Sequence, residues 1–144
     1  MVISADTSFL FSLYGNDSKT PAAIEWSKRN PHPIAITQLN HFELINALRF
    51  AECRSFIATG NAELFASQFR FDFTGGRLIE AHCDLADVLK EANRLSLAHT
   101  LTGGHRGFDI LHVAAARLIR ATHFLTFDAN QKKLATREGL IVPF

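Results

Sequence analysis

The chain opens with Val2-Ile3-Ser4-Ala5-Asp6-Thr7-Ser8, a short apolar run that halts at an acid and two hydroxyl residues. Such a run is typical of a buried strand, and Asp, Thr and Ser commonly cap the helix that follows. We therefore predict a strand that ends at Asp6 and a helix that starts directly after it. The same arrangement recurs at Phe124-Leu125-Thr126-Phe127, which is followed by Asp128 and by another helical segment.

Strands and helices alternate along the rest of the chain. Further strands are predicted at 34–36, around Leu78 and Ile79, and at 140–142. The expected helices span residues 22–29, 37–53, 61–71, 84–99, 110–119 and 129–138. Parallel neighbours need crossover connections, which are usually helices. The pattern therefore predicts an α/β fold of three layers, α/β/α, around a mostly parallel five-stranded sheet.

The composition is that of a folded globular protein. The chain has 144 residues, 47% of them hydrophobic and 20% charged, which fits one domain over residues 1–144 and excludes a disordered or fibrous chain. Fifteen Lys and Arg against fourteen Asp and Glu leave a net charge of +1. Any binding of nucleic acid must therefore come from local patches of charge.

The two cysteines and the chain start indicate a cytoplasmic protein. Cys53 and Cys83 fit no metal-ligand spacing and are too few for a disulfide scaffold, as expected in a reducing compartment. The N-terminal segment lacks the basic leader of a signal peptide, and no stretch approaches the roughly 20 apolar residues of a membrane span. We expect a soluble protein in the cytoplasm.

Three aspartates are expected at one edge of the predicted sheet. Asp6 and Asp128 follow strands, so both belong at the carboxyl ends, where open α/β sheets form their functional crevice. Asp109 follows the glycine-containing loop 102–107 and lies in the first turn of a buried helix, where free amides favour negative charge. All three positions suit the same crevice.

Glu43 is the fourth candidate acid, in the middle of the helix 37–53. Leu39, Ala47 and Phe50 lie near the same helix face, so we expect the carboxylate to be half-buried. No Lys or Arg occupies position 39, 40, 46 or 47, and a half-buried charge is costly unless it is paired. A group from elsewhere in the fold must compensate it.

Four converging carboxylates predict a divalent cation. Without one they would repel each other, and their hard oxygens favour Mg²⁺ or Mn²⁺ over zinc. A bound divalent ion polarises a phosphodiester and acidifies a water, which makes hydrolysis the natural chemistry. Taken singly, however, each aspartate fits an ordinary helix cap, and Glu43 fits a solvated or salt-bridged side chain.

Several motifs resemble those of the PIN-domain nucleases and, within them, the VapC-type toxins of toxin-antitoxin pairs. The resemblance spans essentially the whole chain. Besides the Asp6 and Asp128 motifs, it rests on Phe42-Glu43-Leu44 and, most specifically, on Arg106-Gly107-Phe108-Asp109-Ile110-Leu111-His112-Val113-Ala114-Ala115-Ala116. It implies a three-layer α/β/α fold, dependence on magnesium or manganese, and endonucleolytic cleavage of RNA.

The resemblance also implies which residues form the site. Its acidic quartet, which would serve as catalytic residues and metal ligands, falls on Asp6, Glu43, Asp109 and Asp128. Its supporting hydroxyls correspond to Thr7 or Ser8 and to Thr126. No further acid follows Asp128, so Asn130 is the candidate for an oxygen there, and the number of metal ions, one or two, stays open.

The mechanism that we expect assigns separate roles to the four acids. Asp6, Asp109 and Asp128 hold the ion, while Glu43 orients or deprotonates the attacking water. Arg106 and Lys132 are candidate contacts to RNA phosphates. The alternatives for Arg106 are a solvated side chain or a bridge to one of the acids. The alternative for Lys132 is a solvated side chain.

The partners expected from the resemblance are an RNA substrate, a cognate antitoxin and a second copy of the chain in a homodimer. Phe65, Phe69, Phe71 and Phe73 crowd one segment, which indicates either core packing or a partner surface. His112, one turn after Asp109, is a packed helix histidine or, in a functional role, a partner of the acids or a contact to substrate.

Two other functions remain as alternatives. One is a catalytically silent PIN-like scaffold that binds RNA or protein, although such a scaffold would be expected to have lost acids that are present here. The other is a phosphatase or phosphotransferase of the haloacid-dehalogenase type. That type needs a second aspartate two residues after the first, where this chain has Ser8.

Overall fold

A computed structural model describes the whole chain, residues 1–144. Four strands form one parallel sheet in the order β3-β2-β1-β4. Their bounds are Ile3–Ala5 for β1, Ile34–Ile36 for β2, Leu78–Glu80 for β3 and His123–Leu125 for β4. Chain order runs outward from β1 to β3 and then returns to the opposite side of β1. The sheet therefore changes direction between β1 and β4.

The prediction of a full fifth strand at residues 140–142 is wrong. Ile141 forms a single parallel bridge to His123. Two hydrogen bonds make this bridge, from Phe124 N to the Ile141 carbonyl at 2.9 Å and from Ile141 N to the Thr122 carbonyl at 3.0 Å. Pro143 follows two residues later and has no N–H to continue the ladder, so the pairing stops there.

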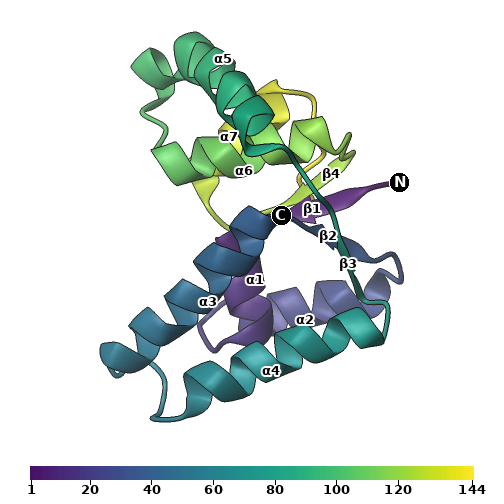
Figure 1. Ribbon diagram of the computed structural model, residues 1–144, viewed down its shortest axis with the longest axis vertical. Helices are drawn as coiled ribbons and strands as arrows, with labels where there is room; N and C mark the ends of the chain where they lie inside the picture. Colours follow the sequence, from purple (N-terminus) through teal and green to yellow (C-terminus); the bar gives the residue numbers. More distant parts are fainter.

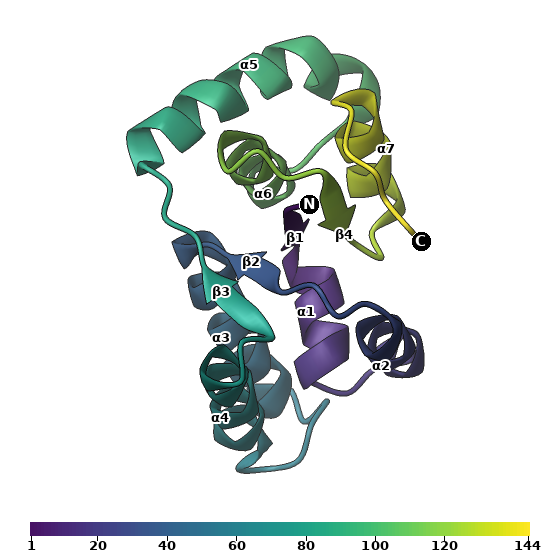
Figure 2. The ribbon, with the colours of Figure 1, turned by 90° about the vertical axis from the view of Figure 1, so that its right-hand side faces the viewer.

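Helices cover both faces of the sheet, as the alternation predicts. They are α1 (Thr7–Tyr14), α2 (Thr20–Arg29), α3 (Gln38–Cys53), α4 (Asn61–Thr74), α5 (Leu85–Gly103), α6 (Gly107–Leu118) and α7 (Ala129–Arg137). Helices α1 to α4 lie on one side of the sheet, and α5, α6 and α7 lie on the other (Figures 1 and 2). The α/β/α layering is therefore confirmed.

Each face of the sheet has its own hydrophobic core. On the α1–α4 side, Phe9, Leu44, Leu48 and Phe69 are fully buried together with Leu125. On the α5–α7 side, the cluster of Val113, Leu95 and Leu134 packs around Phe124. Adjacent residues of a strand point to opposite faces, so Phe124 and Leu125 bind the two helical layers to one strand.

The helix starts are set by local capping. Asp6, Thr37, Asp84 and Asp128 are all N-caps whose side chains accept backbone N–H bonds. Helix α5 continues past the predicted end at His99 to Gly103, and Gly104 then ends it in a left-handed conformation at φ 63°. The loop before α6 is therefore only three residues long.

None of these helices combines the length and the apolar character that a membrane crossing requires.

Candidate active site

The sheet edge between β1 and β4 gathers the predicted residues. Asp6 directly follows β1, and Asp128 lies three residues beyond β4 as the N-cap of α7. These two strands are paired in parallel, with Ala5 opposite Leu125. Their carboxyl ends flank the point at which the chain order reverses, the usual place of a ligand crevice in an open α/β sheet.

Asp6 is almost completely buried, with 4% of its surface exposed. Its carboxylate accepts hydrogen bonds from Phe9 N at 3.0 Å and from Ser8 Oγ at 2.8 Å. Thr126 Oγ1 lies 2.8 Å from its other oxygen. Burial raises the pKa of the Asp6 carboxyl to about 6, although these donors oppose the rise. A nearby cation would favour the charged form.

The buried side chain of Gln131 links the segments that carry Asp6, Asp109 and Asp128. Gln131, with no exposed surface, places Oε1 3.0 Å from Thr126 Oγ1 and donates Nε2–H to the Asp109 carbonyl at 3.1 Å. Its backbone N–H donates to Asp128 Oδ1 at 2.7 Å. Because Thr126 also contacts Asp6, a continuous series of hydrogen bonds connects the end of β1 with the starts of α6 and α7.

Arg106 lies between two of the carboxylates. Its Nε is 3.0 Å from Asp109 Oδ2, and its Nη2 is 3.6 Å from Asp128 Oδ2. The side chain is 78% exposed, so solvent screens both ion pairs. Of the alternatives for Arg106, the structure favours a bridge to the acids. A protein cation thus occupies the space that these two carboxylates share.

Glu43 is compensated from outside its own helix, as expected. Both Thr7 Oγ1 and His112 Nε2 contact its Oε2 atom, and no protein group contacts Oε1. Burial by itself would raise the pKa of Glu43, but the hydrogen bonds from His112 and Thr7, together with the charges of His112 and Arg106, outweigh it, so the net shift is downward. Thr7 is the neighbour of Asp6, which ties Glu43 to the same crevice.

Two buried amides in the site were missed from the sequence. Asn40 and Gln131 each stand three residues after an N-cap, Thr37 and Asp128 respectively. The pattern of a capping residue followed three positions later by an amide is a known helix-start signature. It would have indicated both side chains, but not their further contacts with His112 and the Asp109 carbonyl.

Asn130 and Lys132 lie apart from the acids. The Asn130 side chain donates to the Gly103 carbonyl at 3.1 Å, so it secures the end of α5. Lys132 lines a groove of about 690 Å³ along α7 with Lys133 and Arg137. This basic groove begins at Ala129, directly after Asp128.

The donor chemistry of the site suits a hard divalent cation. Its acids and hydroxyls offer oxygen ligands only, and Arg106 already places positive charge between Asp109 and Asp128. In this conformation no three acidic, histidine or cysteine side chains lie close enough to hold one ion. The carboxylates are instead held by protein donors, with Arg106 on two of them and Thr7 with His112 on Glu43.

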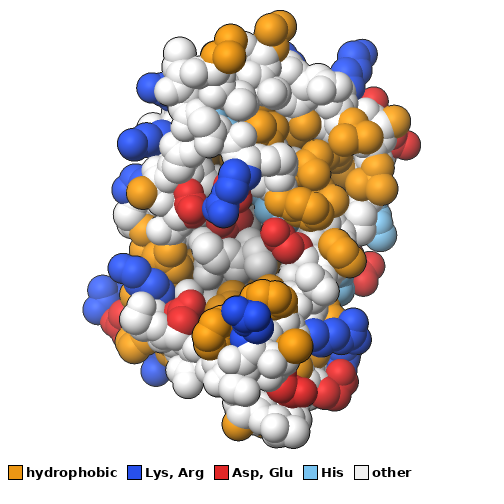
Figure 3. Space-filling view, turned by 90° about the vertical axis from the view of Figure 1, so that its left-hand side faces the viewer, with side chains coloured by type: hydrophobic (Ala, Val, Ile, Leu, Met, Phe, Trp, Pro, Cys, Tyr) orange, Lys and Arg blue, Asp and Glu red, His pale blue; other side chains and the backbone are white.

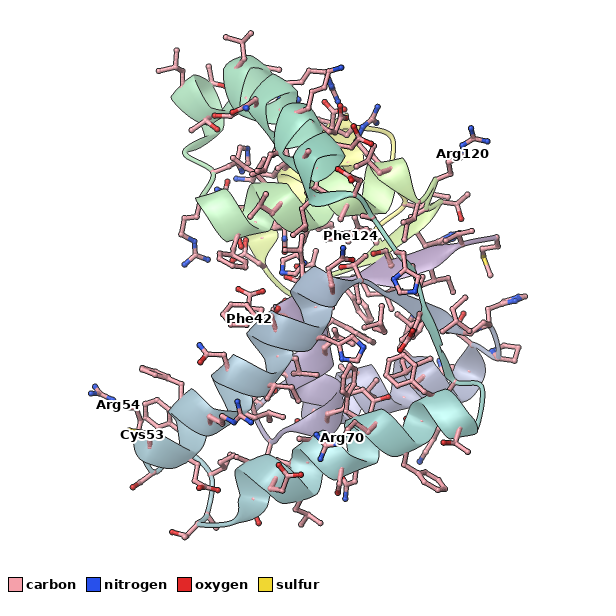
Figure 4. The ribbon with its side chains drawn as sticks, viewed as in Figure 1. Phe42, Cys53, Arg54, Arg70, Arg120 and Phe124 are labelled. Atoms are coloured by element: carbon pink, nitrogen blue, oxygen red, sulfur yellow. The ribbon has the colours of Figure 1, made fainter.

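Aromatic side chains border the site. Phe42 precedes Glu43, Phe108 precedes Asp109, and their ring centroids are 6.4 Å apart. Phe42 is 63% exposed and extends from α3 on the side where α6 begins (Figure 4). The face seen from that side carries acidic side chains around a basic one in a hollow, with hydrophobic side chains beside them (Figure 3).

The sequence matches the model of one protein family, the PIN domain, over residues 3–137. This chain belongs to the PIN domain family. The match includes all four predicted acids and every strand of the sheet. A search of curated proteins found none that matches.

Three solved structures share this PIN fold. VapC20 from Mycobacterium tuberculosis, described as a toxin that cleaves the sarcin-ricin loop, has 18% identity, a TM-score of 0.70 and coverage of 96% of both chains. A toxin-antitoxin complex from Klebsiella pneumoniae has 15% identity and a TM-score of 0.66, over 100% of this chain and 98% of that one. VapBC2 from Rickettsia felis, bound to a promoter DNA fragment, has 18% identity and a TM-score of 0.63, over 99% and 97%.

Proposed function

We propose that this PIN domain is a divalent-metal-dependent endoribonuclease. One observation carries the proposal: short hydrogen bonds connect residues of four separate elements, each contributing one acid, at one sheet edge. Thr126 and Gln131 connect Asp6, Asp109 and Asp128. Thr7 adds Glu43 to this group. Asp6 is buried, and the other three carboxylates are partly exposed, so a bound cation would stabilise the negative charge that gathers here.

The three aspartates would hold the ion, which is Mg²⁺ or Mn²⁺ by the chemistry of its ligands. When bound, such an ion supplies polarisation of the phosphodiester and a more acidic water. Asp6 is anchored by its helix cap and by Ser8, while Asp128 is anchored by Gln131 N. Thr7, Ser8 and Thr126 fix the carboxylates. Asn130 has no such contact in the structure.

Glu43 is suited to accept the proton of the attacking water. Its Oε2 is fixed by two donors, and its Oε1 is left without a protein partner. The lowered pKa keeps the carboxylate ionised at neutral pH. In the proposed reaction, the water oxygen attacks phosphorus and its proton passes to Glu43 Oε1. The opposite P–O bond breaks, and the leaving oxygen takes a proton from solvent.

Basic side chains beside the acids would bind the RNA backbone. The exposed guanidinium of Arg106 lies at the crevice, and Lys132 lies along the groove of α7. Arginine pairs well with phosphate oxygens, and lysine adds positive charge along the path of the strand. We propose that an incoming phosphate or cation takes Arg106 away from one of its two acids.

Metal-dependent cleavage of RNA tests this function. Purified protein is incubated with total cellular RNA in Mg²⁺, in Mn²⁺ and in chelator, and the cut sites are mapped. We expect cleavage that chelator abolishes and that Asp6→Asn and Asp109→Asn remove while the fold is kept. Unchanged cutting by both variants would sink the proposal, and absence of cutting by the wild type under all conditions would favour a silent scaffold.

We further propose that the chain is the toxin of a toxin-antitoxin pair. The support is its family and the likeness of its fold to proteins described as VapC toxins or toxin-antitoxin complexes. Its partners would be an antitoxin and a second copy of the chain. Induced expression should arrest growth with the wild type and not with Asp6→Asn; equal growth would contradict the toxin role.

A further inference from the structure

Asn40 lies one helical turn before Glu43 and has only 1% of its surface exposed. Its side chain reaches three separate parts of the fold. It contacts Thr37 at the start of α3, the Ala5 carbonyl directly before Asp6, and the ring of His112 on α6. Asn40 therefore links the end of β1 to His112, the partner of Glu43.

The orientation of the Asn40 amide follows from two backbone groups. Thr37 N–H donates to one side-chain atom at 2.9 Å, so this atom is the oxygen Oδ1. The other atom lies 2.9 Å from the Ala5 carbonyl, which only accepts, so it is the nitrogen Nδ2. The two assignments agree. Nδ2 therefore also directs a hydrogen toward His112 Nδ1, 3.3 Å away.

We propose that Asn40 is a positioning residue that fixes the tautomer of His112, so that His112 donates its Nε2–H to Glu43. The opposite tautomer would set Nδ1–H against the Asn40 N–H and the Nε2 lone pair against the Glu43 carboxylate. Both ends of the ring would then be unfavourable. His112 is only 3% exposed, so water does not relieve either contact.

The consequence for the site is a fixed carboxylate. With Nε2–H and Thr7 Oγ1 both directed at Oε2, Glu43 is held through this oxygen, and Oε1 has no hydrogen-bond partner in the protein. The catalytic meaning of this arrangement rests on the proposed nuclease function, but the tautomer itself does not. Partners of this kind, which orient a group at a metal site, typically affect activity by about 10–100-fold.

The tautomer is measurable without metal or substrate. Long-range ¹H–¹⁵N correlation spectra of the metal-free protein report the state of both ring nitrogens of its seven histidines. The His112 signals are assigned by their absence in His112→Gln. We expect Nδ1 to be pyridine-like and Nε2 to carry the proton. A proton on Nδ1 of the wild type would overturn the inference, whatever the nuclease assay gives.

Asn40→Asp provides the second test, because it keeps the shape and replaces the donor by an acceptor. One carboxylate oxygen still accepts from Thr37 N, while the other loses the bond to the Ala5 carbonyl and should hold a proton on His112 Nδ1. The matched control is Asn46→Asp, the same exchange three residues after Glu43 at an exposed position without a hydrogen bond to His112.

We expect Asn40→Asp to place a proton on His112 Nδ1 and to lower kcat by about 10–100-fold with KM little changed. Asn46→Asp should leave the tautomer as in the wild type. A folded Asn40→Asp protein whose His112 Nδ1 stays unprotonated would refute the inference. A wild type with the expected tautomer that cuts no RNA would instead refute the nuclease function alone.

Discussion

Thr126 Oγ1 lies 2.8 Å from Asp6 Oδ2, although the two residues are 120 positions apart in the chain. The contact joins the carboxyl ends of two neighbouring parallel strands, β1 and β4. The same hydroxyl accepts the Asp128 N–H at 3.0 Å. A single buried threonine therefore connects the first and last acids of the chain and the start of α7.

Thr126→Val should destabilise the protein because it removes this hydroxyl and keeps the shape. Asp128 N–H loses its acceptor and Asp6 loses one donor, at a cost of about 1–3 kcal/mol for buried groups. Denaturant unfolding measures the change. Thr122→Val, at the exposed residue before β4, is the control: it removes a surface hydrogen bond to the Val2 carbonyl and should change stability by about 0.5 kcal/mol or less. Equal effects of the two exchanges would contradict the role of Thr126.

The charge of Asp6 should make stability depend on pH when no metal is present. Its pKa is about 6 in the folded protein against an ordinary 3.8, so the folded state holds a proton that the unfolded state has lost. The resulting contribution to stability is fully present below pH 3.8 and is lost as pH rises through 6. The difference corresponds to about 3 kcal/mol.

Asp6→Asn removes this titration and keeps a residue that caps helices well. In chelator, the variant should therefore gain stability relative to the wild type by about 3 kcal/mol between pH 4 and pH 8. Adding Mg²⁺ at pH 8 should stabilise only the wild type. A difference between the two proteins that stays constant with pH would show that Asp6 does not titrate in this range.

The strand ends, and the positions of Asp6 and Asp128 beyond them, were predictable because their signals are local. An apolar run followed by Asp marks both β1 and β4, and the parallel alternation brings these ends to one edge. Glu43 was predicted on different grounds, as a half-buried charge without a partner on its own helix. Its actual partners, Thr7 and His112, depend on how α1 and α6 pack on α3, which no local pattern encodes.

Two differences from the sequence prediction lie at the ends of elements. Residues 140–142 have the apolar character of a strand, but only Ile141 pairs before Pro143 ends the ladder. The glycines at 103 and 104 indicate a loop, yet α5 includes Gly103 because packing against α6 and α7 extends it. Tertiary packing decides such ends, and it is not visible in propensity.

Removing Arg106 should strengthen metal binding. Arg106→Gln takes away the positive charge that lies between Asp109 and Asp128. Because both ion pairs are exposed, we expect a modest gain in Mg²⁺ or Mn²⁺ affinity, about 1.5- to 5-fold by calorimetry. Arg120→Gln is the matched control. It removes the same charge beyond the other end of α6, where Arg120 forms no ion pair and its side chain points away from the site (Figure 4). Weaker binding by Arg106→Gln would instead indicate that the guanidinium supports the metal site.

Neighbouring amides on α7 allow a direct choice between the residue favoured by the sequence and the one favoured by the structure. Asn130 donates to the Gly103 carbonyl, whereas Gln131 is fully buried and contacts Thr126 and the Asp109 carbonyl. Gln131→Leu keeps the volume and leaves the Asp109 carbonyl and the Thr126 hydroxyl with fewer partners. We expect a loss of about 1–3 kcal/mol in stability and a 10–100-fold lower cleavage rate.

The comparison variant is Asn130→Leu, which changes the same kind of side chain one position earlier. A helix turns by about 100° per residue, so this exchange affects the end of α5 and leaves the contacts among the acids in place. Its cleavage rate in Mg²⁺ should stay close to that of the wild type. If Asn130→Leu lost more activity than Gln131→Leu, Asn130 would be the oxygen donor after Asp128, and the bridging role of Gln131 would be wrong.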